Sequence, residues 1–467
     1  MDQATRQSSL MLDEPPRVAT TARARGLTTT EWVICGVAAL GFAFDLYEML
    51  VMPIVLRPAL VALGGLVDGT RDFNRWVGLF FYVPALVGGA VGLLGGYLAD
   101  LLGRRRVLVW SILLYAVSSF AASRATTLPQ LLVLRCTTVI GVSVEYVAAV
   151  AWLAELFADP KRRRAVLGYT QSAGALGGLM VTGAYYLAVT YAERLPAIGT
   201  GHEPWRYVLL FGLAPAIPLI LVRPFLPESP AWRLHRSAGL VKRPSVVELF
   251  RPTFRRTTIV TTILFACIYG LASGVLLMTP RIVPGLPEIQ RLPQRDIEQA
   301  VGSVQFIGEM GVLAGRLLLA FLVVRVASHR RLAYGFLIPA LVVIPFVFAV
   351  AATRSLTLLR YGIFAVAVLI NGPVSLLWMY LPRMYPTHLR GTGEGFAHNV
   401  GSRMLGTFAA VITTQLSNVM PGASAPASLA YSAAIVAAFL VAVALLAATS
   451  LREPASDQLP TWTPEHA

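Results

Sequence analysis

The sequence predicts an all-α integral membrane protein with twelve transmembrane helices in two parallel six-helix pseudo-repeats. Three observations lead to this prediction: a scarcity of charge, the number of long apolar segments and a repeated stretch of sequence. Of the 467 residues, 56% are hydrophobic and 13% are charged, which is about half the ~25% charged share of soluble domains. The mean hydropathy is +0.66. A soluble enzyme, a disordered chain and a disulfide scaffold are therefore disfavoured.

The apolar segments are long enough to cross a bilayer, which takes ~20 largely apolar residues per helix. We expect spans at 31–60, 76–99, 107–125, 129–155, 165–190, 206–225, 257–280, 298–326, 332–352, 357–382, 392–416 and 427–450. Several contain Pro or Gly, which bundled membrane helices tolerate because neighbouring helices satisfy the freed backbone groups. The segments are too long and too unalternated for the strands of a β-barrel.

The distribution of basic residues predicts the orientation. An even number of spans puts both termini on one side, and the loops on that side carry most of the Lys and Arg residues. The positive-inside rule then places both termini in the cytoplasm of a multi-pass cell inner membrane protein. The net charge of +15 thus reports orientation and leaves no support for a nucleic-acid partner. Residues 1–30 lack the apolar core of a signal peptide, so we expect a disordered cytoplasmic N-tail, with a cytoplasmic C-tail at 451–467.

An internal repeat divides the chain into an N-terminal six-helix half, 31–225, and a C-terminal six-helix half, 257–450. The cytoplasmic linker between them is expected at 226–256, the longest polar stretch after the N-tail. Residues 95–106 align with 320–331 at an offset of 225. Because this offset spans six helices, an even number, the halves are expected as parallel repeats with a substrate site between them near the bilayer midplane.

The loop after the second span has the spacing Gly-x-x-x-Asp-x-x-Gly-Arg-Arg and resembles the signature loop of the major facilitator superfamily. The glycines let two helices approach closely, while the carboxylate and the arginines can join helix ends at the cytoplasmic face. The second-half copy has Arg325 and Ser328 in place of the Asp and the second Gly. The expected cytoplasmic gate comprises Gly96, Asp100, Gly103, Arg104, Arg105, Glu155 and Arg164.

Further motifs resemble the metabolite–proton symporter branch of that superfamily, which holds sugar, aromatic-acid, nicotinate and monocarboxylate carriers. They are Pro-Glu-Ser-Pro-Ala-Trp at 227–232, Arg135 with Glu145 in the fourth span, Tyr385 to Gly393 followed by Asn399 and Arg403, and Asp45 with Glu48 in the first span. The resemblance implies a transporter driven by the proton gradient.

Charged residues deep in a span are functional-site hypotheses, because each costs about 2.5–3.5 kcal/mol at the helix centre. The chain has seven: Asp45, Glu48, Arg135, Glu145, Glu309, Arg316 and Arg403. Asp45 and Glu48 share a helix face, and two close carboxylates in a low dielectric do not both ionise easily. These two residues and Glu145 are therefore the expected proton-coupling group. The alternative is that they form salt bridges with arginines on other spans, and the two roles are compatible.

Arg403 is the expected anchor of a substrate carboxylate, because the guanidinium fork matches two carboxylate oxygens. Asn399 precedes it by one helical turn. The alternative is a permanent partner such as Glu309, which is also placed to pair with Arg316. For Arg135 with Glu145, a proton relay and a static pair both stay open. The full expected substrate-binding set is Arg403, Asn399, Glu309, Arg135, Asn371 and Tyr380, with His398 and Trp378 as further lining candidates.

The leading function is a proton-coupled symporter that imports a small organic anion, a carboxylate metabolite, by alternating access. The alternatives are a drug or metabolite efflux antiporter, a sugar:proton symporter and a non-transporting membrane sensor. Efflux carriers of the superfamily show a Gly-Pro motif on the fifth span, whereas 172–178 has no Pro. The sequence contains no nucleophile-and-base motif, His/Cys metal cluster or Walker motif. An enzyme, a metal site and ATP drive are thus not expected, and the chain is expected to work as a monomer without a cofactor.

Overall fold

The structure, a computed structural model, describes residues 27–157, 159–199, 201–229, 232–233, 246–323, 325–326, 328–385 and 389–453. The expected N-tail, 1–30, lies almost wholly outside these residues. Most of the expected C-tail, 451–467, and much of the linker, 226–256, lie outside them as well.

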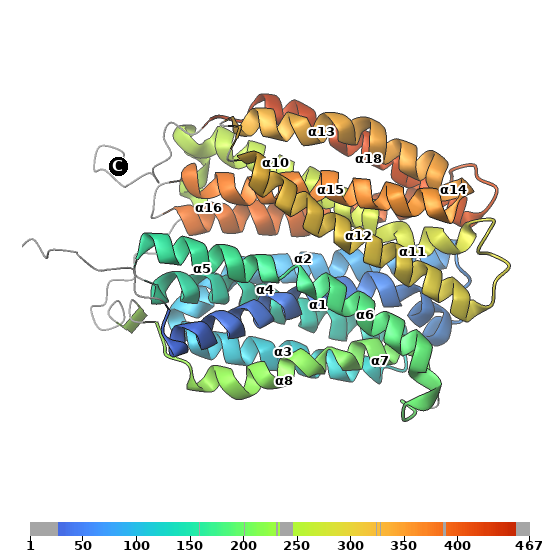
Figure 1. Ribbon diagram of the computed structural model, residues 1–467, viewed down its shortest axis with the longest axis horizontal. Helices are drawn as coiled ribbons and strands as arrows, with labels where there is room; N and C mark the ends of the chain where they lie inside the picture. Colours follow the sequence, from blue (N-terminus) through green and yellow to red (C-terminus); the bar gives the residue numbers. More distant parts are fainter. Residues whose placement is uncertain are drawn as a thin grey trace, which may run out of the picture.

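Long helices run side by side along the molecule and confirm the all-α fold class (Figure 1). We call α1–α8 the N half and α10–α18 the C half, and Figure 1 shows them as two neighbouring layers of helices. The N half contains α1 (Thr29–Gly64), α2 (Arg71–Leu102), α3 (Arg104–Ser123), α4 (Leu128–Leu156), α5 (Pro160–Ala173), α6 (Leu176–Tyr191), α7 (Pro204–Phe211) and α8 (Leu213–Val222). The C half contains α10 (Pro252–Gly274), α11 (Thr279–Ile282), α12 (Gln294–Val323), α13 (His329–Phe346), α14 (Ala352–Arg354), α15 (Leu356–Tyr380), α16 (Arg390–Phe396), η8 (Ala397–Gly406), α17 (Phe408–Leu416) and α18 (Ala425–Thr449).

Local sequence explains where several of these helices begin. Thr28 caps α1 by accepting a hydrogen bond from the N–H of Glu31, whose carboxylate in turn accepts from the N–H of Thr28 at 2.7 Å. This reciprocal arrangement satisfies N–H groups that a helix start leaves free. Thr70 and Ser424 cap α2 and α18 in the simpler way, each by accepting from the N–H three residues later.

Within the described ranges, two of the twelve expected spans do not form a helix long and apolar enough to cross a membrane. In the part of the chain that the structure describes, ten helices are long and apolar enough to cross a membrane. The expected span 165–190 is divided between α5 and α6, and the expected span 392–416 is divided into α16, η8 and α17. The first division falls in a run of small residues, 173–175, which offers little side-chain packing to hold a helix straight. The second contains a π-helix, η8, which breaks the regular α-helical repeat.

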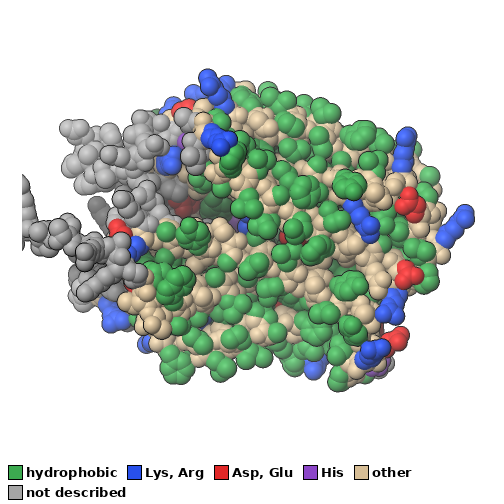
Figure 2. Space-filling view, in the orientation of Figure 1, with side chains coloured by type: hydrophobic (Ala, Val, Ile, Leu, Met, Phe, Trp, Pro, Cys, Tyr) green, Lys and Arg blue, Asp and Glu red, His purple; other side chains and the backbone are tan. Residues whose placement is uncertain are grey.

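The outer surface matches a membrane environment. Figure 2 shows hydrophobic side chains along the sides of the bundle, with charged side chains gathered mainly toward its two ends. Large exposed apolar side chains include Trp110 of α3 and both Phe439 and Leu446 of α18. Exposing such an apolar surface to water is unfavourable, whereas contact with lipid tails is not.

The two halves meet along a few helix pairs that position the candidate site. α2 packs against η8 and α17, and α6 packs against α12. The chain termini leave the described part at one end of the bundle, which we call the terminal end (Figure 1). The opposite end, where the loop between α1 and α2 lies, is called the far end.

Candidate functional site

Arg135 on α4 is held against a gap in the backbone hydrogen bonding of α1. Pro53 lies inside α1 and has no N–H, so the carbonyl of Met49 lacks its usual helical partner. Arg135 Nη2 donates to that Met49 oxygen at 3.1 Å, and Nη1 donates to the backbone oxygen of Glu48 at 2.5 Å. The Glu48 carboxylate interacts with the same guanidinium and lies over Gly212, where a Cβ would be 2.7 Å from Oε1.

A second buried group joins α1, α3, α4 and the segment that follows α8. Arg223 forms an ion pair with Glu145, and the Tyr115 hydroxyl donates a hydrogen bond to the same carboxylate. Asp45 interacts with both Glu145 and Arg223. Gly41 leaves room for the guanidinium, because a Cβ there would lie 2.2 Å from Arg223 Nη2. Glu145 thus holds the ion pair with Arg223, while neither carboxylate oxygen of the buried Asp45 has a hydrogen-bond partner.

The pairing of the buried charges, which the sequence left open, joins different segments. Asp45 and Glu48 are three residues apart, yet their carboxyl groups interact with different arginines, Arg223 and Arg135. The two functional candidates on α4 likewise have separate partners, since Arg135 bonds to α1 and Glu145 to Arg223. Nothing in the sequence singled out Arg223, because an arginine at the very end of an expected span counts as a loop charge.

Arg403 lies between the two halves. It is buried, and Nη1 donates a hydrogen bond to Ser143 Oγ of α4 in the other half. Its Nε has no hydrogen-bond partner, and it takes part in none of the ion pairs formed by the described residues. The expected alternative, a pair with Glu309, is not formed. Glu309 instead lies over Gly178 of α6, where a Cβ would be 2.0 Å from Oε2, and its interaction with Arg316 falls outside ion-pair distance.

Asn399 and Arg403 of η8 face the same helix of the other half. The N–H of Thr407 donates to the oxygen of Ser402, five residues earlier, at 3.1 Å, so the segment has π-helical spacing. A Cβ at Gly89 of α2 would lie 3.2 Å from the Asn399 oxygen and 3.3 Å from Arg403 Cβ. Asn399 is buried, and its amide donates to the oxygen of its own helix at Gly395 at 3.0 Å. The expected role of Asn399 beside Arg403 stays a prediction.

An aromatic cluster surrounds His398 at the same level. The rings belong to Tyr146 of α4, Phe265 and Tyr269 of α10, and Trp378 of α15. The His398 ring centroid lies 5.0 Å from that of Trp378, 5.7 Å from that of Tyr269 and 6.1 Å from that of Tyr146. All but Phe265 keep partial exposure deep in the bundle, so they can contact a small molecule between the halves. His398 and Trp378 were expected here, whereas the three others were not.

Two expected substrate-binding residues make contacts elsewhere. Asn371 Nδ2 donates to the oxygen of Ala367 in its own helix at 3.0 Å. Tyr380 is the last residue of α15, and its hydroxyl donates to the oxygen of Arg452 at 2.7 Å, beside the ring of His329 at 5.8 Å. The prediction that Tyr380 lines the central pocket is wrong, because its position at the helix end puts it at the terminal end of the bundle.

The expected gate region forms a polar network at the terminal end. Arg104 Nη2 pairs with Glu155 at 2.9 Å, and Ser229 Oγ donates to the same carboxylate at 2.5 Å. The N–H of Arg105 lies 3.2 Å from both carboxylate oxygens of Glu228. The Pro-Glu-Ser-Pro motif therefore contacts the signature loop. Three other expected gate residues are described by their backbone alone: Gly96, Asp100 and Arg164.

The same contact recurs in the C half. Gly103 joins α2 to α3 with a φ of 95°, which side chains rarely tolerate, and it lies beside the carboxylate of Glu228. In the C half, Glu453 accepts a hydrogen bond from the N–H of Arg330 at 2.9 Å. Glu453 follows Glu228 by 225 positions, and Arg330 follows Arg105 by the same number. The sequence offset thus corresponds to a repeated carboxylate contact at a helix start.

Glu453 lies outside the membrane-spanning segments and is tied to the start of α13. Partial burial alone would raise the pKa of its carboxyl group, but hydrogen bonds from Ser328 Oγ and from the N–H groups of Arg330 and His329 lower it below the usual value. The Ser328 bond is 2.6 Å long. Negative charge is also favoured at a helix N-terminus.

Comparison with known proteins gives one family. The family model of the Major Facilitator Superfamily matches residues 37–411. The chain is 28% identical over 364 residues to a probable 4-methylmuconolactone transporter of Cupriavidus pinatubonensis, covering 77% of this chain and 78% of the relative. It is 27% identical over 347 residues to the 4-hydroxybenzoate transporter of Pseudomonas putida, covering 68% and 72%.

A solved structure gives the same fold. The crystal structure of a D-xylose-proton symporter is similar with a TM-score of 0.66 and 20% sequence identity, covering 91% of this chain and 98% of that one. The family model spans most of the chain, and the family consists of transporters rather than enzymes. The chain is a multi-pass membrane transporter that belongs to the Major Facilitator Superfamily.

Proposed function

We propose that this transporter is a symporter that imports a small organic carboxylate together with protons by alternating access. In this proposal both termini lie in the cytoplasm, so the far end faces outward, as the loop charges indicate. The drive is the proton gradient, no cofactor takes part, and the monomer is the working unit.

Arg403 is the observation that carries the proposal. A guanidinium held between the halves without a carboxylate partner of its own is costly in a membrane protein. A substrate carboxylate would satisfy it with two parallel charge-assisted hydrogen bonds. Because the group lies where both halves meet, a bound anion would contact both of them, and its affinity would change as they move.

The aromatic cluster supports a substrate with a flat apolar part. Rings around His398 can stack on a planar group while Arg403 holds the carboxylate. Relatives named as transporters of 4-hydroxybenzoate and of 3-(3-hydroxy-phenyl)propionate, each 27% identical to this chain, act on aromatic acids. We therefore place aromatic carboxylates first among the candidate substrates.

Asp45, Glu145 and Arg223 form the proposed proton site. A proton taken up from outside would neutralise the carboxyl pair, and Asp45 also interacts with Arg403. Through that interaction the proton and the substrate anion can act on each other's binding. Glu48 is a further candidate carboxyl group beside Arg135. At the terminal end, the Arg104–Glu155 pair and the Glu228 contact are the proposed cytoplasmic gate.

Uptake into proteoliposomes tests the proposal. Labelled benzoate-type acids, aliphatic acids and sugars would be offered with and without an inward proton gradient. We expect gradient-driven uptake of a carboxylate, a loss of at least ~100-fold in Arg403→Ala, and partial recovery in Arg403→Lys, which keeps the charge but not the fork. Asp45→Asn should abolish gradient-driven uptake and retain exchange. Uptake that does not depend on the proton gradient, full activity of Arg403→Ala, or uptake of sugars alone would contradict the proposal.

A further inference from the structure

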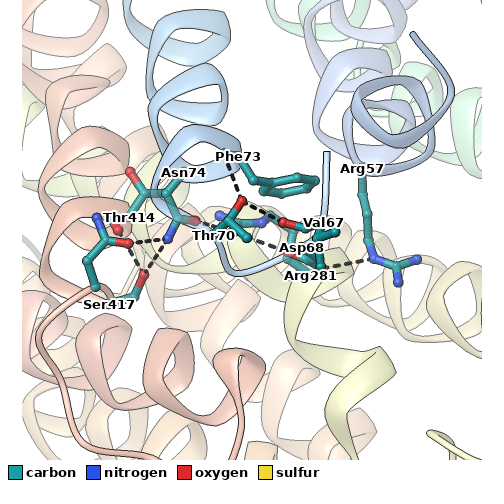
Figure 3. A network of polar contacts seen from close by, with 10 residues as sticks. Arg57, Val67, Asp68, Thr70, Phe73, Asn74, Arg281, Thr414 and Ser417 are labelled. Carbon is teal, nitrogen blue, oxygen red and sulfur yellow. Dashed lines mark hydrogen bonds and ion pairs between the residues drawn. The ribbon is translucent and has the colours of Figure 1, made fainter. Parts of the chain in front are cut away.

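A polar network at the far end joins the two halves (Figure 3). From the N half come Arg57 of α1, Asp68 of the following loop and Asn74 of α2, and from the C half come Arg281 of α11 and Asn418, which follows α17. We call these residues the far-end latch. Their side chains link elements that are far apart in the sequence, so the latch forms only when the halves are together at this end.

The bonds within the latch fall into two kinds. Arg57 Nε pairs with Asp68 Oδ2 at 3.0 Å inside the N half. Four bonds cross between halves: Arg281 Nη2 lies 2.6 Å from Asn74 Oδ1 and 3.4 Å from Asp68 Oδ1, and Asn74 Nδ2 lies 2.6 Å from Asn418 Oδ1 and 3.4 Å from Ser417 Oγ. Asn74 thus donates and accepts across the interface at once.

The residues that form the crossing bonds are buried, which strengthens those bonds. Asn74 is 2% exposed and Arg281 is 5% exposed, and the Arg281 guanidinium lies over the Phe73 ring at 5.0 Å. Hydrogen bonds to charged groups away from water contribute more than exposed ones. Gly78 of α2 faces α17, where a Cβ at Gly78 would lie 3.6 Å from the Val411 side chain and 3.9 Å from Thr414 Oγ1, so the two halves also approach closely at this glycine.

We propose that the far-end latch holds the transporter closed at the far end, and that Asn74 and Arg281 set the balance between the closed and open states. A transporter that opens to alternate sides must separate its halves here once in each cycle. On separation, Asp68 keeps Arg57 as a partner, whereas Arg281 and Asn74 lose all the latch bonds that cross the interface. The cost of opening therefore falls mainly on these two side chains. This inference rests on the transport cycle and not on the identity of the substrate.

Labelling of one cysteine beneath the latch tests the proposal. Thr414 is fully buried, so Thr414→Cys in a chain whose Cys35, Cys136 and Cys267 are replaced by Ala reports opening at the far end. The protein would be held in nanodiscs and treated with a polar maleimide without substrate, so the readout is independent of the proposed function.

Asn74→Ala should raise the labelling rate by on the order of tenfold, since it removes one bond to a charged group and the bonds to Asn418 and Ser417. Asn74→Asp should lower the rate, because a carboxylate attracts Arg281 more strongly than an amide does and can accept from the Asn418 amide nitrogen once that side chain turns round. Gln415→Ala is the matched control, because Gln415 bonds Asn418 within the C half at 3.1 Å. The proposal is overturned if Asn74→Ala labels no faster than this control, or if Asn74→Asp labels faster than the parent. Opposite shifts in two variants of one residue cannot come from misfolding.

Discussion

At the scale of single residues, Arg223 controls how the buried charges of the N half balance. It is the only cation in ion-pair contact with Glu145 among the described residues, and it also interacts with Asp45. Burying two carboxyl groups without it would leave charge in a medium that solvates charge poorly. Its place at the end of the sixth span hid this function, because only the folded chain brings that end over α1 and α4.

Replacing Arg223 should therefore destabilise the protein unless the facing charge is removed too. Arg223→Gln should lower the free energy of unfolding by about 3–5 kcal/mol, the usual cost of breaking a buried ion pair from one side. The double variant Arg223→Gln with Glu145→Gln should recover most of that loss, because the Glu145 carboxylate that lost its cation is then removed as well. Equilibrium unfolding in detergent micelles measures both. A double variant as unstable as the sum of the two single variants would contradict this account.

At the scale of elements, η8 shows how helix geometry decides a site. Gly401 and Gly406 let η8 approach α10, since Cβ atoms there would lie 2.6 Å from the Thr262 oxygen and 3.0 Å from the Ala266 oxygen. The segment held by this contact has π-helical spacing. The sequence pattern of an apolar span is the same for α- and π-helical turns, so it could predict the span but not the π-helical stretch within it.

The start of α13 gives a prediction on pH dependence. Hydrogen bonds at this helix start lower the pKa of Glu453, so its stabilising contribution is fully present above the ordinary value of about 4.3 and is lost as pH falls through the lower folded value. Glu453→Gln should cost ~0.3–1 kcal/mol at pH 7, the usual worth of a charge at a helix N-terminus. Unfolding measured at pH 7 and again well below pH 4 should show the difference between variant and parent disappear. A difference that persists unchanged at the lower pH would argue against the carboxylate as its source.

At the scale of the whole molecule, the repeated halves explain why the fold was predictable. Hydropathy alone located the ten helices that, among the described residues, are long and apolar enough to cross a membrane, since the bilayer demands long apolar runs wherever the chain crosses it. The offset of 225 positions that marked the repeat reappears as the paired contacts Glu228 with Arg105 and Glu453 with Arg330. Glu453 thereby contributes a carboxylate to the C-half loop, whose sequence has Arg325 where the first copy has Asp100.

The orientation of the whole molecule is a separate prediction. A fluorescent protein fused after Ala467 should fluoresce, and alkaline phosphatase fused there should be inactive, because the loop arginines place that end in the cytoplasm. Insertion of the same reporters between α6 and α7 should give the reverse pattern. Active phosphatase at the C-terminus would overturn the orientation, and with it the assignment of the far end to the outside.

The sequence by itself determined the membrane location, the spans, the repeat and the buried charges, because each follows from composition along the chain and from the cost of placing charge in lipid. Only the tertiary structure decided how the charges pair. Asp45 interacts with Glu145 and Arg223 instead of Glu48, Arg403 keeps no carboxylate partner among the described residues, and Asn74 bridges the halves. The physical reason is that pairing depends on helix rotation, kinks such as that at Pro53 and close approach at glycines, which bring together residues hundreds of positions apart.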